Sequence, residues 1–226
     1  MSVTTTETTR QVRIMIGEGM WLDADVTTPP AAKGVVLFAH GSGSGRFSPR
    51  NQNVARQLNA QHLATVLADL LTASEERVDE RTNGLRFNIP LLAQRVERVI
   101  EWTHDDGELS ALAIGLFGAS TGAAAALDGA ALRPDLVRAV VSRGGRPDLA
   151  SKLDRVTAPT LLIVGGKDTE VLRMNESALR KMKCAKRLEV VPGATHLFEE
   201  PGTLERVAAL AGNWFSEHLQ PTIVRP

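Results

Sequence analysis

A serine in a glycine-rich turn is the residue whose position most clearly suggests chemistry. The pentapeptide 118–122, with the sequence GASTG, follows an apolar segment that ends at Phe117 and precedes an alanine-rich segment. Between a strand and a helix, this G-x-S-x-G pattern places the serine hydroxyl on a sharp turn, exposed for nucleophilic attack. Glycine is needed two residues before and after, because side chains there would collide with the neighbouring strand and helix. We predict that Ser120 is a nucleophile; a helix-capping serine is the structural alternative.

A nucleophilic serine needs a base, and the chain has five histidines. His196 lies in the turn 192–196, after a short apolar segment and before the last amphipathic one. We predict that His196 is the base, and a histidine with only a loop or capping role is the alternative. The other histidines are expected at helix ends, within the last helix, or at the start of a glycine-rich loop: His62, His104, His218 and His40.

The base needs a carboxylate that orients it. Asp168 follows the apolar run 160–164 and two glycines, so it is expected at the carboxyl end of a buried strand. Ser120, Asp168 and His196 then occur in the chain order Ser…Asp…His that hydrolases with this strand–turn–helix motif use. A helix N-cap is the alternative role for Asp168, and Asp148, after the preceding strand, is the alternative acid.

A second glycine-rich segment, 40–45, follows the apolar run 35–39. Acyl transfer needs hydrogen-bond donors aimed at the oxyanion of its tetrahedral intermediate. The N–H of the residue after the nucleophile, Thr121, is one expected donor, and an N–H of this segment, from Ser42 or Gly43, is the other. A phosphate-binding loop is the competing interpretation, but the segment matches neither G-x-x-x-x-G-K-[ST] nor G-x-G-x-x-G.

Three arginines lie in segments that are expected to leave strands near Ser120: Arg86, Arg143 and Arg146. Guanidinium groups there could bind a substrate carboxylate in a bidentate manner. The adjacent Gly144-Gly145 pair would let the backbone approach a ligand closely. The alternative is that these arginines pair with local acids such as Asp148 or lie in solvent.

The elements that must position these residues begin with two strands, 12–16 and 21–26, around a turn at 17–19. Strand–helix units follow, which favours a mostly parallel sheet with an antiparallel N-terminal hairpin and helices on both faces. Functional groups gather at the carboxyl ends of strands in such sheets. Further strands are expected at 35–39, 64–68, 111–117, 137–142, 160–164 and 188–191, and helices at 49–60, 91–102, 123–132, 171–183 and 203–219. Residues 70–88 are polar and broken, without a clear element, and no insertion is long enough for a large cap domain.

Composition limits the remaining possibilities. The 226 residues fit one α/β domain, expected over 11–220, with tails at 1–10 and 221–226. Twenty-six basic and 26 acidic residues give zero net charge, which argues against a nucleic-acid or membrane-surface partner. We expect a cytoplasmic enzyme with no metal or organic cofactor. The single cysteine, Cys184, permits no intramolecular disulfide and lies at the end of an expected helix.

These motifs resemble the dienelactone hydrolase-like branch of the α/β hydrolases. The resemblance extends from about 12 to 219 and is carried by the segments 38–45, 118–122, 141–148 and 192–198. It implies an eight-stranded sheet and hydrolysis of small esters or lactones. Dienelactone hydrolases carry a cysteine nucleophile, whereas this chain has Ser120, so general carboxylesterase activity is the expectation. Thioester hydrolysis, perhydrolysis and a non-catalytic ligand-binding module are the alternatives.

Overall fold

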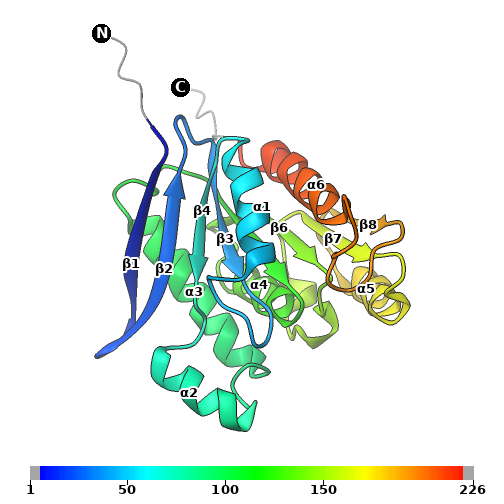
Figure 1. Ribbon diagram of the computed structural model, residues 1–226, viewed down its shortest axis with the longest axis horizontal. Helices are drawn as coiled ribbons and strands as arrows, with labels where there is room; N and C mark the ends of the chain where they lie inside the picture. The colour runs from blue at the N-terminus through cyan, green and yellow to red at the C-terminus, as the bar shows by residue number, and fades with distance from the viewer. Residues whose placement is uncertain (1–5, 221–226) are drawn as a thin grey trace.

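The computed structural model describes residues 6–220, and an eight-stranded sheet runs through its centre in the order β1-β2-β4-β3-β5-β6-β7-β8 (Figure 1). The pairs β1–β2 and β2–β4 are antiparallel, and all the other pairs are parallel. The prediction of a mostly parallel sheet with an antiparallel N-terminal hairpin is therefore confirmed. The strands are β1 (Thr8–Gly17), β2 (Met20–Thr28), β3 (Gly34–Ala39), β4 (Leu63–Ala68), β5 (Ile114–Ala119), β6 (Val137–Arg143), β7 (Thr160–Gly165) and β8 (Lys186–Val191).

The residue pattern of each strand matches its place in the sheet. Every residue of β3, β4, β5 and β7 is buried, because helices cover both faces of the central strands. At the edge, β1 and β2 alternate between more and less exposed residues. The apolar runs in the sequence are thus the strands with two covered faces.

Helices form a layer on each face of the sheet (Figure 1). Buried residues of α1 and α6 join one apolar cluster with one face of the strands, and those of α3, α4 and α5 join another on the opposite face. Ser48 caps α1 by accepting from the N–H of Asn51, and Pro49 takes the first helical position. The helices are α1 (Pro49–Asn59), α2 (Ala73–Thr82), α3 (Ile89–Asp105), α4 (Thr121–Leu132), α5 (Thr169–Lys181) and α6 (Thr203–His218), with short 3₁₀ turns at Pro147–Leu149 and Leu153–Arg155.

The helix α2 corrects the expectation that residues 70–88 lack an element. Thr72 accepts from the N–H of Glu75, and the Glu75 carboxylate accepts from the N–H of Thr72, which forms a capping box. Asn83 ends the helix in the left-handed conformation, with φ of 53°. Only Asp79 of this helix is buried, so no apolar periodicity could reveal it.

Two further expectations need correction. β1 begins at Thr8, so residues 8–10 of the predicted N-terminal tail belong to the sheet; residues 1–5 and the predicted tail 221–226 lie outside the described residues. Cys184 lies in a bend between α5 and β8 rather than in a helix, since α5 ends at Lys181. No helix within residues 6–220 has the length and apolar character needed to cross a membrane.

Candidate active site

Ser120 occupies a strained turn between β5 and α4. Its φ of 52° and ψ of −125° are unusual for a residue with a side chain. A Cβ at position 118 would collide with the backbone of Ala123, and one at position 122 would collide with the carbonyl oxygen of Ala39. Glycine at both positions is therefore a steric requirement of a turn that places Ser120 at the carboxyl edge of the sheet.

The side chains of Asp168 and His196 are in direct contact. Asp168 precedes α5, yet its carboxylate makes no hydrogen bond to the first turn of that helix. Its Oδ2 atom instead lies 2.7 Å from Nδ1 of His196, which comes from the connection between β8 and α6. A hydrogen bond at Nδ1 fixes the ring orientation and leaves Nε2 available for another partner.

Ser120 and His196 line one cavity of about 210 Å³ at the carboxyl edge of the sheet. Within residues 6–220, no hydrogen bond joins the Ser120 hydroxyl to His196, although the two side chains share this space. Catalytic hydrogen bonds are often long in the absence of substrate and tighten when it binds. The structure therefore brings the three predicted residues to one site, with the Asp–His contact formed and the Ser–His contact open.

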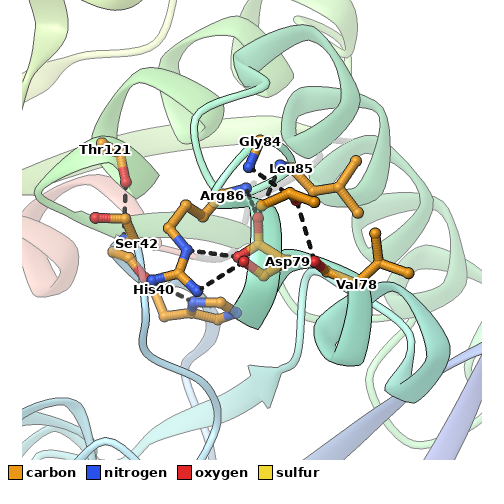
Figure 2. Close-up of polar contacts among 10 residues, drawn as sticks. His40, Ser42, Val78, Asp79, Gly84, Leu85, Arg86 and Thr121 are labelled. Atoms are coloured by element: carbon orange, nitrogen blue, oxygen red, sulfur yellow. Dashed lines mark hydrogen bonds and ion pairs between the residues drawn. The ribbon is translucent and has the colours of Figure 1, made fainter.

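The predicted oxyanion donors are backbone N–H groups, and they differ in the acceptor that each one has in the structure. Thr121 is the first residue of α4, where backbone N–H groups have no acceptor inside the helix. The N–H of Ser42 donates to Oγ1 of Thr121 at 2.9 Å (Figure 2). Ser42 lines the 210 Å³ cavity, whereas Gly43 lines a neighbouring cavity of about 660 Å³. Of the two candidates for the second donor, the location favours Ser42.

His40 holds the same peptide from its other side, as Figure 2 shows. Its Nε2 accepts from the N–H of Leu70 at 3.0 Å, so the proton lies on Nδ1, which is 3.0 Å from the carbonyl oxygen of Gly41. The Gly41–Ser42 peptide is thus held at its carbonyl by His40 and at its N–H by Thr121. His40 therefore orients the loop, and its ring connects that loop to the chain that follows β4.

Two of the three arginines considered as substrate ligands have carboxylate partners. Arg146 makes a bidentate pair with Asp148, with both N···O distances at 2.8 Å. Nε of Arg86 lies 2.5 Å from the buried carboxylate of Asp79, and its guanidinium lies beside the loop that holds Ser42 (Figure 2). These pairs match the alternative interpretation, in which the arginines neutralise local acids. Asp148, the alternative acid, is therefore engaged by Arg146.

Arg143 differs because its side chain is buried in the wall of the 210 Å³ cavity, together with Ser120 and His196. The glycine that follows has a role in packing. Gly144 has φ of 50°, and a Cβ there would lie 3.1 Å from the carbonyl oxygen of His196. This glycine thus allows the loop that carries the histidine to approach closely.

Sequence reasoning missed two residues of the same cavity, Arg50 and Asn51, which belong to the first turn of α1. The capping pair Ser48-Pro49 was the available signal, because it places the start of a helix directly after the glycine-rich loop. Cys184 lies away from this cavity. It contacts Thr160, the first residue of β7, at the amino edge of the sheet, whereas the cavity is at the carboxyl edge. In the part of the chain that the structure describes, no cluster of three or more His, Cys, Asp or Glu side chains is arranged to hold a metal ion.

Comparisons with known proteins place these features in a family. Residues 22–218 match the model of the dienelactone hydrolase family. The crystal structure of a dienelactone hydrolase from Anabaena variabilis is 52% identical, with a TM-score of 0.93, and the alignment covers 96% of this chain and 100% of that one. An esterase domain from a Rhodothermus marinus protein shares the fold at 19% identity, with a TM-score of 0.73 and coverage of 93% and 99%.

Another relative is named for a different reaction than hydrolysis. A Mycobacterium tuberculosis protein with the provisional name of phosphoribosyl transferase is 55% identical over 195 residues, which are 86% of this chain. Those residues are only 43% of that protein, so this chain spans less than half the length of its curated relative. The alignment leaves the larger part of the relative unmatched.

Proposed function

The chain belongs to the dienelactone hydrolase family, and from this premise we propose that it is a hydrolase that cleaves small carboxylic esters or lactones through an acyl-enzyme on Ser120. The observation that carries the proposal is one cavity lined by a strained serine and by a histidine whose Nδ1 contacts a carboxylate. Nucleophile, base and orienting acid are the parts that acyl transfer needs.

In the first half of the proposed reaction, Nε2 of His196 takes the proton of the Ser120 hydroxyl as its oxygen attacks the ester carbonyl carbon. The negative charge moves to the carbonyl oxygen, where the N–H groups of Thr121 and Ser42 stabilise it. For Ser42 this means that the oxyanion shares or replaces Oγ1 of Thr121 as the acceptor. The tetrahedral intermediate then collapses, the carbon–oxygen bond to the alcohol breaks, and His196 protonates the leaving oxygen.

In the second half, His196 takes a proton from water, and the resulting hydroxide attacks the acyl carbon. Collapse releases the acid and returns the proton to Ser120. Asp168 stabilises the imidazolium in both halves and keeps the proton on Nδ1. The 660 Å³ cavity shares Ser42, Ser44, Ser48 and Arg50 with the smaller one, which leaves room for the part of the substrate that lies beyond the carbonyl.

Two direct tests are labelling of the protein with a fluorophosphonate probe and, separately, hydrolysis of p-nitrophenyl acetate. We expect stoichiometric labelling of Ser120 by mass spectrometry, and a loss of turnover of about 10⁴-fold in Ser120→Ala. Thermal unfolding controls for folding of the variant. A Ser120→Ala protein with near-wild-type esterase activity would contradict the proposed mechanism.

Thioester hydrolysis and perhydrolysis use the same three residues, so only a substrate screen separates them from ester hydrolysis. Failure of the probe to label a folded protein would favour the non-catalytic ligand-binding module instead. We propose no phosphoribosyl transfer for this chain, because more than half of that relative has no match here.

A further inference from the structure

A second and larger cavity lies beside the one that contains Ser120. Its volume is about 660 Å³, within the range of roughly 300–1,000 Å³ that is usual for small-molecule sites. It lies between the start of β2, the loop after β3 and the segment that leads from β4 into α2. Ser42 and Ser44 line both cavities, whereas Ser120 and His196 line only the smaller one. A substrate held at Ser120 can therefore extend into the larger cavity.

Charged side chains of both signs line this larger cavity. They are three carboxylates and two guanidinium groups, those of Asp23, Asp69, Glu76, Arg46 and Arg50. Arg46 pairs with Asp69, and its guanidinium also lies 3.9 Å from the carboxylate of Asp23, so opposite charges offset each other within the wall. An apolar group in this space would remove the charged groups from water without replacing their hydrogen bonds. A ligand of the larger cavity must therefore be polar.

Several hydrogen-bonding groups of the wall have no protein partner. Among residues 6–220, no hydrogen bond or ion pair involves the carboxylate of Glu76 or the hydroxyl of Ser44. The carboxylate of Asp23 has only the long contact with Arg46, and half of its side chain is exposed. Carboxylates accept hydrogen bonds, and a serine hydroxyl both donates and accepts. A ligand with several hydroxyl groups can satisfy these residues together, because each hydroxyl also donates and accepts.

Two aromatic rings of the wall favour a neutral ligand. The guanidinium of Arg46 lies 4.3 Å from the ring centre of Phe47, and that of Arg13 lies 5.2 Å from the ring centre of Trp21. A cationic ligand would meet these like charges at the rings, and an anionic ligand would meet the three carboxylates. Phe47 is 62% exposed, so its ring offers apolar surface to the C–H groups of a neutral ligand.

We propose that the larger cavity binds the alcohol part of the substrate and that this alcohol is a sugar, so that the preferred substrates are short-chain acyl esters of sugars. This inference rests on the proposed ester hydrolysis and adds the chemical class of the leaving alcohol. A sugar is neutral, carries hydroxyls around its ring and exposes C–H groups on the ring faces, which are the properties that the wall requires.

The two cavities then divide the substrate between them. Ser120 keeps the acyl group through both halves of the reaction and lines only the smaller cavity, so a short acyl group belongs there. His196 protonates the sugar oxygen when the ester bond breaks, and the sugar leaves through the larger cavity. Water then takes the acyl group from Ser120, so the products are a carboxylic acid and the free sugar.

The kinetic test compares two acetate esters that share the acyl group and a six-membered ring but differ in their hydroxyls. They are methyl 6-O-acetyl-α-D-glucopyranoside and cyclohexylmethyl acetate, and release of acetate is measured for both. We expect the wild type to have a kcat/KM about tenfold higher or more for the sugar ester, mainly through a lower KM. Glu76→Ala should reduce this ratio by roughly tenfold, as expected for a lost hydrogen bond to a charged group. Phe47→Ala should reduce it by about threefold or more, because a contact with the ring is lost.

Glu80→Ala and Phe87→Ala are the matched controls. Glu80 is an exposed carboxylate on the same helix as Glu76, Phe87 is another exposed ring, and neither lines the cavity. Both variants should keep the wild-type ratio. Equal kcat/KM values for the two esters in the wild type, or the same loss of the ratio in the controls, would overturn the proposal. A higher kcat/KM for acetylcholine than for the sugar ester would also overturn it, by showing that the cavity selects a cation.

A binding experiment separates failure of this inference from failure of the proposed function. Titration of Ser120→Ala with methyl α-D-glucopyranoside, followed by saturation-transfer NMR, measures sugar binding without any turnover. We expect binding that weakens about tenfold when Glu76→Ala is added, and none of comparable strength for cyclohexylmethanol. Hydrolysis of p-nitrophenyl acetate by the wild type, without sugar binding, would refute the sugar site alone. Sugar binding by a protein without esterase activity would support the site and refute the hydrolytic function.

Discussion

At the scale of single residues, the position of Asp168 in the sequence allows two roles, a helix N-cap or a partner of His196. Its position before α5 suits an N-cap, but its φ of −91° and ψ of 66° leave the side chain without a hydrogen bond to the helix. The carboxylate is instead 2.7 Å from His196, in a half-buried pair. In the proposed reaction the imidazole becomes charged, and its contact with Asp168 is then stronger than a helix cap, because both partners are ions.

We expect Asp168→Asn to fold but to lose roughly 10³–10⁴-fold in kcat, because an amide favours the wrong tautomer of His196. The comparison is Asp148→Asn, which breaks the pair with Arg146 on the loop after β6 and should change kcat by less than about threefold. Steady-state kinetics on a neutral ester measure both. Full activity in the Asp168 variant together with a loss in the Asp148 variant would reverse the assignment.

At the scale of elements, the turn between β5 and α4 depends on a close approach to β3. Gly122 lies so near the carbonyl oxygens of Ala39 and His40 that a methyl group has no room. Because β3 and β5 are hydrogen-bonded neighbours, neither can move without breaking the centre of the sheet. The strain at Ser120 is therefore supported by rigid backbone on both sides.

Gly122→Ala should consequently destabilise the protein by about 2 kcal/mol or more, although alanine is the better helix former. Gly107→Ala is the control, because a Cβ there meets no atom within 4 Å. Its effect on the free energy of unfolding should stay within about 0.5 kcal/mol. Urea unfolding measures both, and similar stability of the two variants would show that the turn tolerates a side chain.

The loops after β3 and β4 form a second pair of coupled elements, joined by His40. Desolvation of the ring lowers the pKa of His40, and the hydrogen bond with the carbonyl oxygen of Gly41 and the charges of Asp69 and Glu76 offset only part of that effect. The bond from the N–H of Leu70 also requires an unprotonated Nε2. The folded state therefore binds this proton less readily than the unfolded chain does.

The contribution of a neutral His40 to stability is complete above the ordinary pKa of 6.5 and is lost as the pH falls below it toward the lower value of the folded state. We expect His40→Gln to lose less thermal stability than the wild type between pH 7.5 and pH 5.5. His104→Gln, a change on the exposed end of α3, should follow the wild type. Parallel curves of Tm against pH for all three proteins would contradict this assignment.

At the scale of the whole molecule, the parallel sheet explains why distant segments meet. β3, β5, β6, β7 and β8 run in the same direction, so their carboxyl ends share one edge (Figure 1). The loop with Ser42, the serine turn, Arg143, Asp168 and the loop with His196 each follow or end one of these strands. The strand–helix connections thus collect at one edge residues that span more than half of the chain.

Local sequence patterns were sufficient to predict the strands and the serine turn. Continuous apolar runs indicated the buried strands, and the spacing of glycines around Ser120 indicated the turn, because both follow from sterics over a few neighbouring residues. The chain order of Ser120, Asp168 and His196, and the position of each after an apolar run, are likewise properties of the sequence. The polar helix α2 was not predictable in this way, since its one buried residue gives no periodic signal.

Which of the three arginines is paired with an acid is decided in the folded structure. Arg146 and Arg86 pair with acids two and seven positions away, whereas Arg143 contacts Asn51 across 92 positions and has no ion pair among residues 6–220. A Cβ at Gly144 or Gly145 would lie close to other protein atoms. Pairing energies depend on distance and burial in three dimensions, which a one-dimensional pattern does not contain. Arg143 therefore comes to lie beside Ser120 and Asn51 only when the fold brings β6 and α1 together.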